Sequence, residues 1–188
     1  MNREGTSSQS NATRPVVSDD NDAGRVVVLG LGNILLSDEG VGVHAVNALI
    51  KQYIFTPPVE LIDGGTMGLD LLPLFQTRGR ILIIDAVDFG KPPGHIGVLE
   101  GDRISSVLNP KLSAHHIGLS DILFTAKLMC ETPPEVRLIG IQPKSLETGL
   151  DMTPEIRVKL SALIDLVLQK LKEWNIECVL QSPQKSSL

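Results

Sequence analysis

Acidic residues and histidines, which can bind metals or move protons, follow several hydrophobic runs of this sequence. Glu39, Asp63 and Asp85 come after the ends of such runs, and His115 and His116 lie just before a predicted helix. If the runs are neighbouring strands of one parallel sheet, these residues gather at its carboxyl edge. Three carboxylates brought together repel one another, and protons or a cation relieve that repulsion. A set of Glu, Asp and His suits nickel or zinc better than magnesium or calcium.

The spacing of these residues also allows a simpler interpretation. Glu39 and Asp85 are 46 residues apart, and Asp85 and His115 are 30 apart, so they form no local metal motif. Asp38 and Glu39 could instead stabilise the first turn of a helix through its dipole, with Asp38 as the N-cap. Spacing alone therefore leaves both a metal site and solvated loop acids open.

The glycines at 30 and 32 suggest a second kind of ligand. The sequence GLGN at 30–33 follows a hydrophobic run, as a dinucleotide-binding loop would. The third glycine of that motif is replaced by Leu35, however, and Asp38 and Glu39 would repel a phosphate at the start of the helix. We therefore expect no nucleotide cofactor.

The elements that position these residues are predicted from hydrophobic periodicity. Continuous β-branched runs separated by helix-length intervals are typical of strands covered by helices on both faces. The sequence therefore predicts a three-layer α/β/α sandwich with a mostly parallel, twisted central sheet. Strands are expected at 26–29, 59–62, 81–84, 95–99 and 136–141, and helices at 39–53, 68–75, 119–129 and from Pro154, with Thr153 as N-cap, to Leu171.

Length and composition limit the remaining possibilities. The 188 residues suit one domain at 25–180, between a disordered tail at 1–24 and a flexible tail at 181–188. A net charge of −5 and only 3% aromatic residues argue against nucleic-acid binding. No apolar stretch is long enough to span a membrane, and the polar start has no secretory signal, so we expect a cytoplasmic protein. Cys130 and Cys178 are expected to be inert thiols, and His44 and His95 to be structural or solvated.

Five segments, in this order, resemble the hydrogenase maturation endopeptidases. They are GLGNILLSDEGVG at 30–42, DGGTMG at 63–68, IIDA at 83–86, SAHHIGL at 113–119 and GIQP at 140–143. The likeness extends over about residues 26–174. It implies an aspartyl-type endopeptidase that removes a short C-terminal peptide from the nickel-loaded precursor of a [NiFe] hydrogenase large subunit, together with other maturation proteins.

The same resemblance assigns roles to individual residues. The family's metal ligands fall on Glu39, Asp85 and His115, and the nickel they bind belongs to the substrate and is not a permanent prosthetic metal. Many members have Pro and Gln around the ligand histidine, whereas this chain has Ala114 and His116. His116 could therefore replace or assist His115.

Either nickel or a carboxylate could activate the water for cleavage or polarise the scissile carbonyl. The candidate acids are Asp63, which lies in a glycine-rich turn that a substrate can approach closely, and Asp38. Two other functions stay open at this stage. A non-catalytic nickel chaperone for the large subunit would use the same three ligands. The sequence GLGN also resembles the start of the peptidyl-tRNA hydrolases, although the acidic composition offers no basic face for tRNA.

Overall fold

The central element of the protein is a five-stranded sheet. The computed structural model describes residues 25–107, 114–129 and 135–181, and for 114–118 the backbone only. The strand order is β3-β1-β4-β6-β5, and every pairing is parallel except that of β5 with β6. The strands are β1 (Val26–Leu31), β3 (Val59–Gly65), β4 (Arg80–Ala86), β5 (Ile96–Glu100) and β6 (Glu135–Ile141). The predicted mostly parallel sheet is confirmed, and each predicted strand is present.

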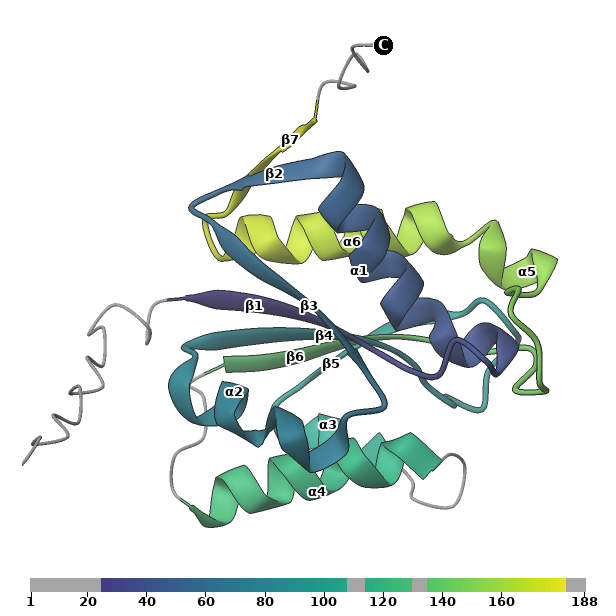
Figure 1. Ribbon diagram of the computed structural model, residues 1–188, viewed down its shortest axis with the longest axis horizontal. Coiled ribbons are helices and arrows are strands. Elements are labelled where there is room, and N and C mark those ends of the chain that lie inside the picture. The colour runs from purple at the N-terminus through teal and green to yellow at the C-terminus, as the bar shows by residue number, and fades with distance from the viewer. Residues whose placement is uncertain (1–24, 108–113, 130–134, 182–188) are drawn as a thin grey trace, which may run out of the picture.

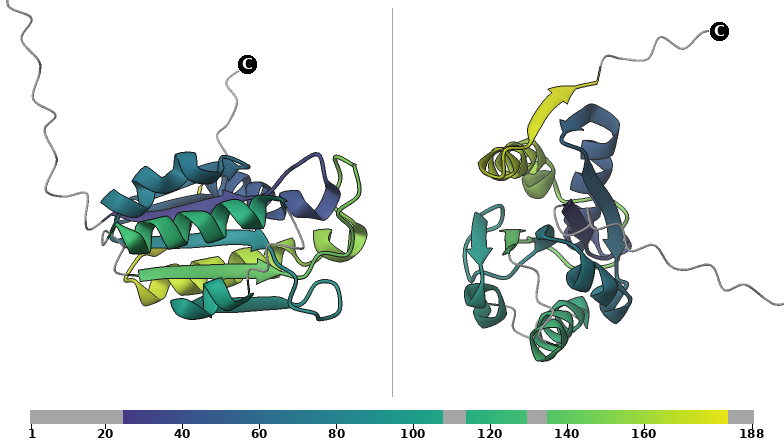
Figure 2. Two further views of the ribbon diagram at one scale, coloured as in Figure 1. Left: turned by 90° about the horizontal axis from the view of Figure 1, so that it is seen from below. Right: turned by 90° about the vertical axis from the view of Figure 1, so that its left-hand side faces the viewer.

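Helices cover both faces of this sheet (Figures 1 and 2). One face carries α1 (Val41–Gln52) and α6 (Leu160–Glu173), and the other carries η3 (Gly68–Leu71), α2 (Leu72–Thr77), α3 (Asp102–Val107) and α4 (Ala114–Leu128). Successive side chains of a strand point to opposite faces, so Val26 and Val28 join one core and Val27 and Leu29 the other. The three-layer sandwich follows because both faces of the strands are hydrophobic.

A two-stranded antiparallel ribbon beside the main sheet was not predicted. It pairs β2 (Tyr53–Thr56) with β7 (Glu177–Leu180), and Ile54 lies opposite Val179. The ribbon lies at the top of Figure 1, where α1 ends. Gln181, predicted to begin the C-terminal tail, donates its N–H to the carbonyl of Gln52 at 2.8 Å. The prediction missed the ribbon because its short strands, far apart in sequence, meet only in the folded chain.

Several predicted helices have different limits in the structure. The helix expected at 39–53 starts as a 3-10 turn, η2 (Ser37–Gly40), and α1 ends at Gln52 because Tyr53 begins β2. The helix expected from Pro154 to Leu171 is divided into α5 (Pro154–Arg157) and α6. The helix at 68–75 is η3 followed by α2, and α4 begins at Ala114 and not at 119. The short α3 was not predicted.

In the parts of the chain that the structure describes, no helix has the length and apolar character needed to cross a bilayer. The predicted tail at 1–24, most of the predicted tail at 181–188, and Cys130 lie outside the described residues. Cys178, on β7, is a half-buried free thiol.

Candidate active site

Two glycines allow α1 to begin directly on the sheet. A Cβ atom at Gly42 would lie 2.1 Å from the carbonyl oxygen of Ile84, and one at Gly30 would lie 2.3 Å from the carbonyl oxygen of Gly42. Any larger residue at either position would push the helix away from β1 and β4. This close approach places η2, the turn that precedes α1, at the carboxyl ends of both strands.

Gly32 lies directly against the backbone of Glu39. It has φ +121°, a conformation that favours glycine, and a Cβ atom there would lie 1.8 Å from the carbonyl oxygen of Glu39. The glycine at 32, within the sequence GLGN at 30–33, therefore allows its backbone to lie in close contact with the backbone at Glu39. This contact accounts for the glycine at 32 without a phosphate ligand.

Three acidic side chains are buried at this edge of the sheet. Asp38 and Asp85 are 0% exposed and Glu39 is 4% exposed, and no other charged side chain in the described part of the chain is buried. Asp85 lies near the end of β4, where its Oδ1 accepts the N–H of Ala86 at 2.8 Å. Glu39 lies in η2, which contacts β4. A buried carboxylate is costly unless other groups compensate its charge. Glu39 and Asp85 therefore bring two buried acidic groups to the carboxyl edge of the sheet.

The carboxylate of Asp38 accepts hydrogen bonds from the loop at 143–153, which is far from Asp38 in sequence. Its Oδ2 accepts the N–H groups of Lys144 and Ser145 and the hydroxyl of Thr153, each at 3.0 Å, and its Oδ1 accepts the N–H of Thr153 at 2.7 Å. The suggestion that Asp38 caps a helix is wrong, because its side chain makes no capping hydrogen bond to η2 or α1. Thr153 does occupy the N-cap position of α5, but its hydroxyl bonds Asp38 and does not cap the helix.

Asp63 is the accessible acid of this edge. It lies beside Gly30 in the pairing of β3 with β1, and its side chain is exposed. Its Oδ1 accepts the N–H of Gly65 at 3.1 Å, and its Oδ2 lies 3.4 Å from the Nδ2 of Asn47 on α1. These two contacts hold the carboxylate at the end of the strand and leave it exposed to solvent.

His115 lies in the first turn of α4. In Figure 1 this helix starts at the end of the molecule where the parallel strands finish and runs back along the sheet. The predicted ligand histidine and its neighbour His116 therefore lie on the helix turn nearest this edge. Among the described side chains, which do not include those of 114–118, no three His, Cys, Asp or Glu groups are close enough to hold a metal ion.

The structure also shows a positioning residue that sequence reasoning missed. Gln142 follows β6 and is 9% exposed, and its Oε1 accepts the N–H groups of Phe89 at 2.7 Å and Lys91 at 3.2 Å. It thereby holds the segment that follows Asp85. The only sequence signal was its place after a buried strand, in GIQP at 140–143.

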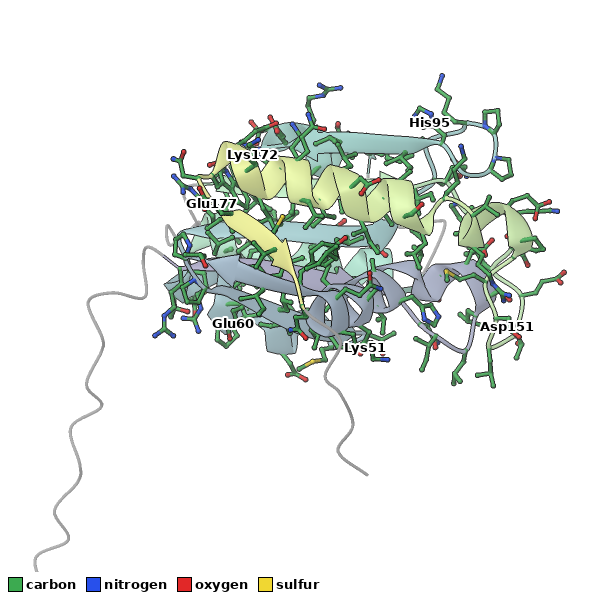
Figure 3. The ribbon with its side chains drawn as sticks, turned by 90° about the horizontal axis from the view of Figure 1, so that it is seen from above. Lys51, Glu60, His95, Asp151, Lys172 and Glu177 are labelled. Atoms are coloured by element: carbon green, nitrogen blue, oxygen red, sulfur yellow. The ribbon has the colours of Figure 1, made fainter. Side chains whose placement is uncertain are left out.

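The remaining histidines have the surroundings that the sequence led us to expect. His95 is exposed, and its ring meets the Phe89 ring edge-on at 5.5 Å. In Figure 3 His95 and Asp151 lie at the same end of the molecule, where the parallel strands finish, and Glu60 and Glu177 lie at the opposite end. His44 is half-buried on α1.

A mostly parallel sheet covered on both faces, with buried carboxylates at its carboxyl edge, defines an α/β protein whose ligand site lies at that edge. The hydrogenase maturation protease family model matches residues 43–170. The chain is 36% identical to the hydrogenase 2 maturation protease of Escherichia coli, over 82% of this chain and 95% of that one. It is 38% identical to the hydrogenase expression/formation protein HoxM of Cupriavidus necator, over 79% of this chain and 75% of the relative.

Solved structures agree with these sequence matches. The hydrogenase-maturating endopeptidase HybD from Escherichia coli has a TM-score of 0.80 at 36% identity, covering 84% of this chain and 98% of that one. The [NiFe] hydrogenase maturation protease HybD from Thermococcus kodakarensis has a TM-score of 0.61 at 27% identity, covering 78% and 98%. This chain belongs to the hydrogenase maturation protease family and is therefore a peptidase.

Proposed function

We propose that this protein is the endopeptidase that removes a short C-terminal peptide from the precursor of a [NiFe] hydrogenase large subunit. The family supports the reaction class, and the names of its relatives indicate the substrate. The observation that carries the proposal is the burial of Glu39 and Asp85 at the sheet edge that also presents the accessible acid Asp63. The proposal includes the cytoplasmic location expected from the sequence.

Nickel is part of the substrate in this proposal. Glu39 and Asp85 supply carboxylate oxygens and His115 an imidazole nitrogen, a donor set that suits nickel. The two buried carboxylates lie in a low-dielectric environment, where their attraction for a cation is stronger than in water. A precursor that carries nickel would be held by all three groups, and one without nickel would not. Cleavage would then depend on nickel, because the enzyme would select its substrate by coordination of the metal and not by a pocket for a particular side chain.

Asp63 is the group we assign to cleavage. An exposed carboxylate held by Asn47 and the N–H of Gly65 can accept a proton from a water molecule. The water oxygen then bonds to the scissile carbonyl carbon, the C–N bond breaks, and the leaving nitrogen takes up the proton that Asp63 accepted from the water. When nickel is bound nearby, it supplies Lewis acidity.

Exposed apolar side chains at the same edge support docking of the precursor. Leu35 is 54% exposed and Leu150 is 70% exposed, and their segments are joined by a hydrogen bond from the N–H of Gly149 to the carbonyl of Leu35 at 2.9 Å. Ile34 and Leu146 on the same two segments are 44% and 39% exposed. A protein substrate would cover these side chains when its C-terminal segment reaches Asp63.

The test compares nickel-loaded with nickel-free precursor and measures the mass of the large subunit after incubation. We expect trimming of the loaded form only, and its loss in Glu39→Gln, Asp85→Asn and His115→Ala, with His95→Ala as a matched control. Equal trimming of both precursors would exclude recognition of nickel. Binding of the precursor without loss of mass would indicate the alternative, a nickel and large-subunit chaperone.

A further inference from the structure

We propose that Asp38 is a positioning residue that fixes Glu39 by closing the loop at 143–153 onto the site; this inference rests on the proposed function. Asp38 is fully buried and immediately precedes Glu39 in η2. Successive side chains of a 3-10 helix diverge by about 120°. The carboxylate of Asp38 therefore points to the loop while that of Glu39 takes another direction.

The hydrogen bonds of Asp38 join the two ends of the loop. Lys144 and Ser145 stand at its start and Thr153 at its end, and all three donate to the same carboxylate. The backbone N–H of Asp38 also donates to the carbonyl of Ser145 at 3.2 Å. A single side chain thus closes the loop and attaches it to the turn that carries Glu39.

Further hydrogen bonds attach the middle of the loop at 143–153 to η2. Ser37 donates its N–H to the carbonyl of Gly149 at 2.8 Å and its hydroxyl to the carbonyl of Glu147 at 2.9 Å. Ser37 has φ +50°, a left-handed conformation that a residue other than glycine keeps only when its surroundings impose it. The loop therefore imposes the backbone conformation immediately before Asp38 and Glu39.

The same geometry argues against proton transfer by Asp38. An ionised carboxylate has about four acceptor sites, and this one accepts four hydrogen bonds at 0% exposure. Substrate and solvent have no access to it. Asp38, which the sequence nominated together with Asp63 for cleavage, acts on the reaction through Glu39.

The test uses variants at both ends of these hydrogen bonds. Thr153→Val removes the hydroxyl donor and keeps the carboxylate, Asp38→Asn removes the charge, and Thr153→Ser restores the hydroxyl. Asp151→Asn is the matched control, because Asp151 lies in the same loop and the change removes only an exposed ion pair with Arg157 of α5. We measure KM and kcat for trimming of the nickel-loaded precursor, together with amide hydrogen exchange.

We expect Thr153→Val to raise KM about tenfold with a smaller change in kcat, and Thr153→Ser and Asp151→Asn to match the unmodified protein. Exchange of the Glu39 amide, which donates to the carbonyl of Leu36 at 3.1 Å, should rise in Thr153→Val and Asp38→Asn. In direct binding of the nickel-loaded precursor, adding Thr153→Val to Glu39→Gln should cause no further weakening, because Asp38 acts through Glu39.

An unchanged KM in Thr153→Val, or an additive weakening of precursor binding in the double variant, would overturn the inference. A fall in kcat alone in Asp38→Asn would also overturn it, in favour of proton transfer by Asp38. If the unmodified protein does not trim the precursor, the proposed function fails. The exchange of the Glu39 amide then decides the inference alone, because that measurement needs no substrate.

Discussion

Replacement of Gly32 by alanine should displace Glu39 and slow cleavage about a hundredfold. The new Cβ atom would lie 1.8 Å from the carbonyl oxygen of Glu39, whereas Cβ atoms essentially never come within 3.0 Å of such an atom. The backbone at Glu39 must therefore move by about 1.2 Å or more. The positive φ of +121° adds a strain of about 1 to 3 kcal/mol for any residue with a Cβ. A shift of about 1 Å in a group that holds the substrate can cost about a hundredfold in rate.

The assay is trimming of the nickel-loaded precursor, followed by mass spectrometry, with unfolding in urea to measure stability. Gly101→Ala is the control for backbone strain, because Gly101 also has a positive φ, +55°, but has no atom within 4 Å of the new Cβ. We expect Gly101→Ala to lose stability and keep its activity. Trimming by Gly32→Ala at the rate of the unmodified protein would refute the reasoning that this glycine positions Glu39.

Three further predictions concern other parts of the molecule. The side chain of Arg137 is 12% exposed and forms an ion pair with Glu135, and its Cζ lies 4.8 Å from the centre of the Trp174 ring. Because Arg137→Ala removes both contacts, it should lower the free energy of unfolding by about 2 kcal/mol. The same change at Arg80, which is 43% exposed, should cost less than about 1 kcal/mol, and urea unfolding compares the two. Burial would raise the pKa of Glu135, but its interactions with Trp174 and Arg137 together hold it below its ordinary value of 4.5. The stability from this pair is therefore present above pH 4.5 and is lost as pH falls through the lowered pKa, and melting curves of Glu135→Gln should show a weaker decline in acid. Leu150→Asp should change stability by less than about 0.5 kcal/mol but raise KM for the precursor; an unchanged KM would remove Leu150 from the docking surface.

The sheet and the edge that carries the site were predictable from local patterns. Val, Ile and Leu runs separated by helix-length intervals indicate buried parallel strands, and in such a sheet the strands finish at a common edge. The residues that follow them, Glu39, Asp63 and Asp85, lie at that edge in the structure. The ligand and cleavage roles of these acids stay predictions.

The burial of Glu39 and Asp85 was not predictable, because a hydrophobic run shows where a strand ends and not what covers the next side chain. Glu39 is buried because Gly32 and Gly42 admit the turn and the helix close to the sheet. The antiparallel ribbon of β2 and β7 was missed for a related reason, since short strands far apart in sequence carry no local signal of their pairing.

The sequence by itself determined the fold class, the family and the edge of the sheet to which we assign the chemistry, because each depends on periodicity and motifs within short segments. The tertiary structure alone decided which acids are exposed and which are buried among hydrogen-bond donors. Asp38 and Thr153 are 115 residues apart, and each looks like a helix cap within its own segment. They bond each other because folding brings their segments together in a buried environment, where a carboxylate needs several donors.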